Sequence, residues 1–138
     1  MPKKTKKSDK RKAIGKSKRQ KKARRIMVFD DEPDIRETLQ ILFEMEGYEV
    51  RTMPHCDECY QHYLEHKPHF VLVDILVPAS HAEEIVALMT DSKVAYMSAA
   101  RLPESEKKRL LKLKHVVDFI EKPFDVEELL DKLDNHLR

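Results

Sequence analysis

Four apolar runs of this chain each lead into a side chain that can take part in phosphoryl chemistry. If these runs are neighbouring parallel strands, then a cluster of carboxylates, a lone carboxylate, a hydroxyl and an ammonium meet at one edge of one sheet. Hydroxyl and ammonium groups bind phosphoryl oxygens, so this combination predicts a phosphoryl site. The runs and the polar residues that follow them are 26–29 with Asp30, Asp31 and Glu32, 70–73 with Asp74, 94–97 with Ser98, and 116–121 with Lys122.

The strands that must position these groups are predicted from composition. The runs are rich in Val, Ile, Phe and Tyr and do not alternate with polar residues, which is typical of strands buried on both faces. Residues 48–52 add a further strand. Helical segments lie between the strands, and the first of them, 33–46, repeats apolar residues near a 3.6-residue period, with Pro33 in its first turn and Gly47 placed to end it.

Four more helices are predicted around Cys59 to Leu64 and over residues 82–89, 104–113 and 126–137. Five strands alternating with five helices imply right-handed crossovers and a parallel sheet covered on both faces. In such α/β sheets ligands bind beyond the carboxyl ends of the strands, where the strand order reverses. The polar residues that follow the apolar runs are expected at this edge.

Charge divides the chain into two parts. Residues 1–25 carry 14 Lys or Arg and a single acid, Asp9, whereas residues 26–138 carry the other 13 bases and 24 acids. The first part has too few apolar residues to form a core, so we expect 1–25 to be a basic, disordered tail and 26–138 to be one domain. No apolar stretch approaches the roughly 20 residues of a membrane span, so a cytoplasmic protein with reduced cysteines is expected.

These motifs, taken in order, resemble the receiver domain of two-component response regulators, such as the stand-alone chemotaxis regulator. The resemblance covers residues 25–138. It depends on Asp30 to Asp34 after the first strand, Asp74 with Pro78 four residues later, Ser98-Ala99 after the fourth strand, and 119–124 at the fifth. It implies a flavodoxin-like, doubly wound parallel sheet with strand order 2-1-3-4-5 and five helices.

The resemblance also implies the chemistry of the site. Asp74 would accept a phosphoryl group from a sensor histidine kinase. Mg²⁺ would be held by Asp30, Asp31, Asp74 and the backbone carbonyl of Leu76, with Asp31 as a direct ligand and Asp30 acting through water. Lys122 and Ser98 would each bind a phosphoryl oxygen. The protein would supply position and countercharge, as a self-phosphorylating regulator and not as an enzyme that turns over substrate.

A switch is implied by the same positions. When phosphate draws Ser98 inward, the aromatic residue three places before Lys122, here Phe119, would fill the space that Ser98 leaves. The face formed by the fourth helix, fifth strand and fifth helix would then bind or release an unknown downstream protein. Leu76 and Ala100 stand where the family commonly has residues that flank the path of the hydrolysing water, so an altered phosphate lifetime is expected.

Simpler interpretations exist for several of these residues. Asp30, Asp31 and Glu32 could supply capping charge to the next helix, and Phe119 could merely pack. His55, Cys56, Cys59 and His62 have ligand types that could suit zinc or a redox pair, although Cys59 lies where the second helix should face the sheet. His66 and His69 are expected at the surface. A phosphatase of the aspartyl-phosphate type is disfavoured, because Leu76 replaces the second acid that such enzymes need.

The basic tail supports an alternative function. A polycation of this density binds nucleic acid non-specifically and with strong salt dependence, so the chain could be a nucleic-acid-associated protein that its receiver regulates. The tail could instead dock on the acidic domain or on an anionic membrane surface, or serve only solubility. Nothing in residues 1–25 selects among these partners.

Overall fold

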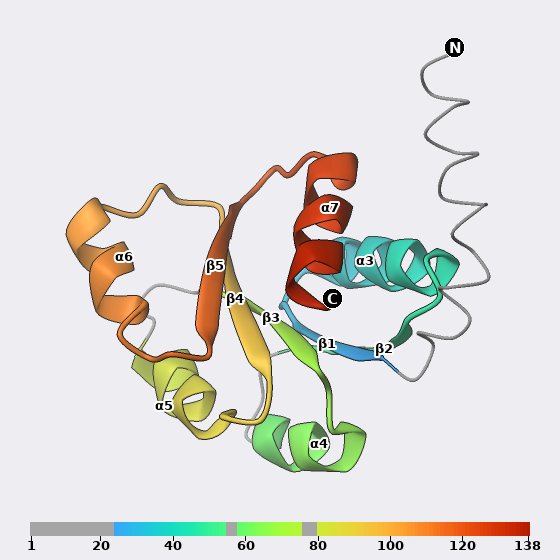
Figure 1. Cartoon of the computed structure of the whole chain (residues 1–138), viewed down its shortest axis with the longest axis horizontal. Helices are drawn as coiled ribbons and strands as arrows, with labels where there is room; N and C mark the ends of the chain where they lie inside the picture. Colours follow the sequence, from blue (N-terminus) through green and yellow to red (C-terminus); the bar gives the residue numbers. More distant parts are fainter. Residues whose placement is uncertain (1–23, 55–57, 76–79) are drawn as a thin grey trace.

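A computed structural model of the chain describes residues 24–54, 58–75 and 80–138. Its centre is a parallel five-stranded sheet with the order β2-β1-β3-β4-β5, which confirms the strand order implied by the resemblance (Figure 1). The strands are β1 (Arg25–Phe29), β2 (Glu49–Met53), β3 (Phe70–Asp74), β4 (Lys93–Ser98) and β5 (Val116–Glu121). All five lie within a residue or two of the segments predicted from the sequence.

The helices between the strands are α3 (Pro33–Met45), α4 (Cys59–His66), α5 (Ser80–Leu88), α6 (Glu104–Leu110) and α7 (Val126–His136). Pro33 occupies the first turn of α3, and Gly47 after its end has φ 97°, a conformation that glycine adopts without steric cost. The clearest differences from the predicted boundaries are at the start of α5 and the end of α6. Helix α5 begins two residues earlier, and α6 stops at Leu110 because the Lys112 amide bonds the carbonyl of Arg109, a tighter turn that ends the helix.

Two hydrophobic cores cover the two faces of the sheet, and Figure 1 shows α3 and α7 together on one side of it. Alternate strand residues such as Ile26 and Val28 face these two helices, whereas Met27 and Phe29 face α4, α5 and α6. Cys59 is buried in the second core, as predicted, and its Sγ lies 3.6 Å from the carbonyl oxygen of Pro54. The strands β1, β3 and β4 are thereby buried on both sides, which accounts for their continuous apolar runs in the sequence.

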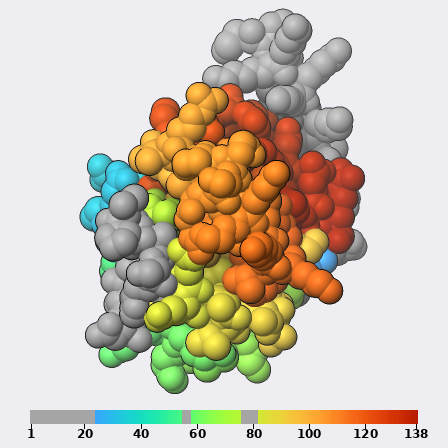
Figure 2. Space-filling model, turned by 90° about the vertical axis from the view of Figure 1, so that its left-hand side faces the viewer, coloured from blue at the N-terminus to red at the C-terminus, as the bar shows by residue number. Residues whose placement is uncertain are grey.

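Helices α5 and α6 lie side by side on the surface in Figure 2, where they are yellow and orange. The Arg109 guanidinium of α6 spans the gap and donates two hydrogen bonds, of 2.6 and 3.0 Å, to the carboxylate of Glu83 on α5. Arg109 also pairs with Glu106 of its own helix. This bidentate contact fixes the relative position of the two helices more tightly than apolar packing alone.

The register of the sheet brings the carboxyl ends of the central strands to one level. Phe29 pairs with Val73, Asp74 with Met97, and Ser98 with Glu121. The order of the strands reverses between β1 and β3, so the residues after Phe29 and Val73 flank the switch point where α/β sheets bind ligands. None of the helices in the described ranges is both long and apolar enough to cross a membrane.

Candidate functional site

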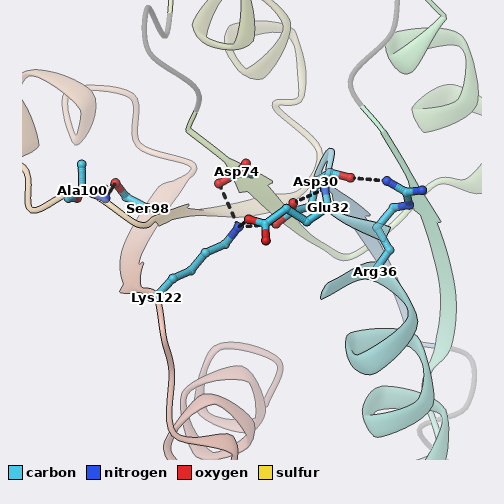
Figure 3. A network of polar contacts seen from close by, with 7 residues as sticks. All are labelled: Asp30, Glu32, Arg36, Asp74, Ser98, Ala100 and Lys122. Atoms are coloured by element: carbon cyan, nitrogen blue, oxygen red, sulfur yellow. Dashed lines mark hydrogen bonds and ion pairs between the residues drawn. The ribbon is translucent and has the colours of Figure 1, made fainter. Parts of the chain in front are cut away.

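Asp30, Asp74 and Lys122 meet at the carboxyl edge of the sheet, as Figure 3 shows. The Lys122 Nζ lies 2.6 Å from Asp30 Oδ2 and 3.2 Å from Asp74 Oδ1. All three side chains are buried, with Asp30 fully excluded from solvent. The sequence places Asp30 and Lys122 far apart, but the carboxyl ends of β1, β3 and β5 lie at the same edge of the sheet and bring their charges together.

Both carboxylate oxygens and the carbonyl oxygen of Asp30 make polar contacts. Its Oδ1 accepts a hydrogen bond of 2.9 Å from the backbone amide of Glu32, and its carbonyl oxygen accepts one of 2.7 Å from the Arg36 guanidinium of α3. Glu32 occupies the N-cap position of α3, but its side chain makes no capping hydrogen bond to the helix. The Asp30 carboxylate therefore contacts two partners, with Oδ1 on the amide of the N-cap residue Glu32 and Oδ2 on the Lys122 ammonium.

Lys122 remains a cation although it is buried. Burial by itself would lower the pKa of the Lys122 ammonium, but hydrogen bonds to Asp30 and Asp74 and the charges of those two carboxylates outweigh it and raise that pKa above its ordinary value. The side chain of Lys122 is only 8% exposed. The positive charge of Lys122 thus lies at the strand ends, where the carboxylates of Asp30 and Asp74 would otherwise repel one another.

Ser98 ends β4 with its hydroxyl turned away from Asp74, and Phe119 lies in the neighbouring strand β5. The Ser98 hydroxyl donates a hydrogen bond to the Ala100 carbonyl oxygen at 2.5 Å and accepts one from the Ala100 amide, and Figure 3 shows it pointing away from Asp74. Phe119 is half-buried and stacks on Tyr96 of β4, with ring centroids 6.0 Å apart. Lys122 is joined to Ser98 through the backbone, because its amide donates to the Ser98 carbonyl oxygen.

The family model of the response regulator receiver domain matches residues 26–134 of this chain. The chain belongs to the response regulator receiver family. Phosphorylation and Mg²⁺ binding are typical of this family, and its members have a regulatory role.

Individual relatives agree with the family assignment. The phosphate regulon transcriptional regulatory protein PhoB of Pseudomonas aeruginosa is 28% identical over 118 residues, which are 82% of this chain and 51% of PhoB. The chain therefore spans about half the length of that relative. A response regulator from Thermotoga maritima has the same fold, with a TM-score of 0.73 and 22% identity over 83% of this chain and 97% of that one.

A further similar structure is the histidine kinase ThkA in complex with the response regulator TrrA. The matched chain of that complex has a TM-score of 0.68 and 27% identity, over 83% of this receiver and 99% of its own length. Together with the family model, these similarities identify the chain as the receiver domain of a two-component response regulator.

The donor chemistry of this receiver suits Mg²⁺, which prefers hard oxygen ligands. Asp30 and Asp74 present buried carboxylates, and Asp31 follows Asp30 directly with an exposed side chain. In the part of the chain that the structure describes, no three His, Cys or acidic side chains are grouped closely enough to hold a metal ion. The Lys122 ammonium bridges two of the carboxylates, and Leu76, whose carbonyl was expected to complete the set, lies outside the described residues.

The sequence analysis placed Glu32 in the acidic cluster but gave it no contact with Lys122, and it did not identify Arg36. Arg36 donates to the Asp30 carbonyl oxygen, and Glu32 places its Oε1 3.3 Å from the Lys122 Nζ. Glu32 was recognised only as part of an acidic run beside a helix, because nothing in its spacing distinguishes a capping charge from a ligand of a distant lysine. The signal that could have identified Arg36 is its position, because a cation in the first turns of α3 lies close to the acidic run that precedes the helix.

The cysteine and histidine cluster is not assembled as a metal site in the described residues. Cys59 packs in the core, and His62 lies 3.7 Å from the Glu58 carboxylate of its own helix. His55 and Cys56 lie outside the described residues. The expectation that His66 and His69 are surface residues is wrong, since both are half-buried and hydrogen bonded to backbone atoms of β1.

Proposed function

We propose that Asp74 accepts a phosphoryl group from a phosphohistidine of a sensor histidine kinase. In this step an Asp74 carboxylate oxygen attacks phosphorus, the P–N bond to the imidazole breaks, and its electron pair returns to the imidazole. The observation that carries the proposal is the position of Asp74, a buried strand-end carboxylate 3.2 Å from the Lys122 ammonium. A carboxylate attacks a dianion poorly unless nearby cations offset the repulsion, and Lys122 supplies such a charge.

The other site residues have supporting roles in this proposal. Asp30, Asp31, Asp74 and the carbonyl of Leu76 would hold Mg²⁺, which would supply further positive charge to the phosphoryl oxygens. Lys122 would bind one phosphoryl oxygen, and Ser98 would leave the Ala100 carbonyl to donate its hydroxyl to another. The partnership with a histidine kinase is supported by the likeness to a chain of the ThkA–TrrA complex.

We infer that the signal leaves through the face formed by α6, β5 and α7. A groove of about 290 Å³ runs along this face, and its lining includes Lys107 of α6, Phe119 of β5 and Lys132 of α7. Phe119 thus connects the groove to Tyr96 beside the strand end that carries Ser98. When Ser98 turns toward the phosphoryl group, Phe119 would move into the space it leaves and reshape the groove for an unknown downstream protein.

We propose that the folded domain comprises residues 26–138 and that residues 1–25 form a basic tail of a cytoplasmic regulator. The family match begins at Ile26 and strand β1 begins at Arg25, which supports a boundary there. The 14 bases of the tail would bind nucleic acid or an anionic surface through charge alone. Salt-dependent retention of the full chain on DNA, lost when residues 1–25 are deleted, tests this role, and retention that survives the deletion contradicts it.

The phosphoacceptor role is tested by intact-mass spectrometry after incubation with acetyl phosphate and Mg²⁺. We expect a single phosphoryl adduct on the native chain and on the control Asp91→Asn, which changes an exposed turn, and none on Asp74→Ala. An adduct that persists on Asp74→Ala would place the chemistry elsewhere. If the native chain forms no adduct and beryllofluoride does not bind, the proposed function is overturned. Continuous release of phosphate from an ester would instead indicate a phosphatase.

A further inference from the structure

Glu32 is the most exposed of three carboxylates that share the Lys122 ammonium. Its Oε1 lies 3.3 Å from the Lys122 Nζ, and 63% of its side chain is exposed, compared with 7% for Asp74 and none for Asp30. Figure 3 shows the ends of all three acidic side chains around the end of Lys122. One ammonium therefore separates the Glu32 carboxylate at the surface from the Asp74 carboxylate inside.

We propose that Glu32 is a positioning residue that holds Lys122 and selects among phosphodonors by their charge. The inference rests on the proposed phosphoacceptor role of Asp74, and it assigns to Glu32 the regulation of phosphoryl transfer at that same site. Glu32 places negative charge at the entrance, so it slows phosphoryl transfer to Asp74 most for the donors that carry the most negative charge.

The first reason is the hydrogen-bonding capacity of Lys122. An ammonium has three N–H donors, and here the three carboxylates of Asp30, Asp74 and Glu32 lie within reach of them. A phosphoryl oxygen that binds Lys122 must displace one of these partners. Asp30 has the shortest contact and is buried, and Asp74 is the reacting group.

Glu32 is therefore the partner that the phosphoryl oxygen displaces. Its contact with Lys122 is the longest of the three, and its solvated carboxylate loses little when the contact breaks. The incoming phosphoryl group has to compete with Glu32 for the Lys122 ammonium. It also has to move past the negative charge of the Glu32 carboxylate. Both effects oppose transfer, and the second grows in proportion to the charge of the donor.

The second reason is that the Glu32 side chain does not serve as a hydrogen-bonding cap of α3. It is the N-cap residue of α3, yet its side chain accepts no hydrogen bond from the helix. The contact that orients Asp30 comes from the Glu32 backbone amide, which every substitution except proline retains. The variant Glu32→Gln is therefore expected to fold and to keep the position of Asp30.

The test compares two small donors in the presence of Mg²⁺ at low ionic strength. Acetyl phosphate is a dianion at neutral pH, whereas phosphoramidate retains an ammonium and has a smaller net negative charge. Removing one charge near the reacting group should raise the rate of Asp74 phosphorylation about fivefold for acetyl phosphate and about twofold for phosphoramidate. The ratio of the two rates is the decisive quantity, because a general change in structure would alter both rates alike.

Three controls complete the experiment. Glu49→Gln removes the same charge from an exposed residue at the opposite edge of the sheet and should leave the ratio unchanged. Glu32→Asp should retain most of the discrimination, and added salt should reduce the difference between the native chain and Glu32→Gln. If the ratio of the two phosphorylation rates is the same in Glu32→Gln as in the native chain, the proposed role of Glu32 is overturned, and the proposed function of Asp74 is not affected. A native chain that accepts no phosphoryl group from either donor overturns the proposed function and this inference with it.

Discussion

The Ser98 hydroxyl is hydrogen bonded to the Ala100 carbonyl oxygen, on the side of β4 that faces away from Asp74. This bond lies within one short loop and costs little to exchange for another of the same kind. A phosphoryl group on Asp74, as proposed, would offer the same hydroxyl a charged acceptor, and such hydrogen bonds are roughly twice as strong as neutral ones. If Asp74 is the phosphoacceptor, as proposed, this orientation of Ser98 is the one expected before phosphorylation.

The first prediction follows from this exchange. Ser98→Ala should weaken the binding of beryllofluoride, a mimic of the phosphoryl group, about tenfold, because one hydrogen bond to a charged group is lost. Ser98→Thr keeps the hydroxyl and should retain native affinity. Isothermal titration calorimetry in the presence of Mg²⁺ measures both variants. Equal affinities for the native chain and Ser98→Ala would show that the hydroxyl does not reach the acyl phosphate.

Phe119 carries the second prediction. Its ring stacks on Tyr96 of β4, so Phe119→Ala should leave the rate of Asp74 phosphorylation within about twofold of the native rate. The response of α6 and α7 to beryllofluoride should decrease, because the side chain that would fill the space left by Ser98 is gone. Amide chemical shifts measure this response. Phe124→Ala, which changes another aromatic residue of the same groove, is the matched control.

The sheet and the site were predictable from the sequence for a physical reason. Strands buried on both faces must be apolar along their whole length, and the side chains that follow them must meet at one edge, so Asp30, Asp74 and Lys122 could be placed together. The orientation of Ser98 toward Ala100 could not be predicted, because both of its hydrogen bonds are local and leave no pattern in the sequence. Contacts across the site, such as that between Glu32 and Lys122, join residues with no detectable periodicity.

The third prediction concerns the stability of the Asp30–Lys122 pair without divalent ions. Lys122→Met leaves the fully buried Asp30 carboxylate without its cation, which should lower the free energy of unfolding by about 3 kcal/mol. Asp30→Asn should cost less, about 1 kcal/mol, because Lys122 keeps Asp74 and Glu32 and the Glu32 amide keeps an acceptor.

The double variant tests whether Asp30 and Lys122 stabilise the folded protein as a pair or independently of one another. Asp30→Asn combined with Lys122→Met removes the charge that was stranded, so its loss of stability should be smaller than the sum of the two single losses by about 1–3 kcal/mol. Urea unfolding in buffer with a chelator measures all four proteins. Strictly additive losses would mean that the two side chains do not interact in the folded protein.

His66 and His69 are more buried than the composition of the segment around them predicts. They flank Lys67 and Pro68 in a polar, loop-like segment, a composition typical of the surface. The fold places this segment against β1, where the Arg25 amide donates to His69 Nδ1 at 2.9 Å and His66 Nε2 contacts the Ile26 carbonyl oxygen. These are long-range contacts, and only the assembled sheet reveals them.

The pKa of His69 yields the last prediction. Burial and the neighbouring charges of Arg25 and Arg24, with a smaller contribution from His66, lower this pKa below its ordinary value of 6.5. The unfolded chain therefore binds the proton more readily than the folded one. The stabilisation from a neutral His69 is fully present above about pH 6.5 and is lost as the pH falls toward the lower folded-state pKa.

Unfolding by urea at about pH 7.5 and about pH 5.5 measures this dependence. His69→Asn keeps an oxygen that can accept from the Arg25 amide but cannot be protonated, so it should lose less stability on acidification than the native chain does. His62→Asn, which replaces a histidine of α4 that lies beside Glu58, is the matched control and is expected to behave as the native chain does. If the slope of the native chain persists in His69→Asn, the proton is taken up at another group, and His66, whose pKa is also lowered by burial, is the next residue to replace.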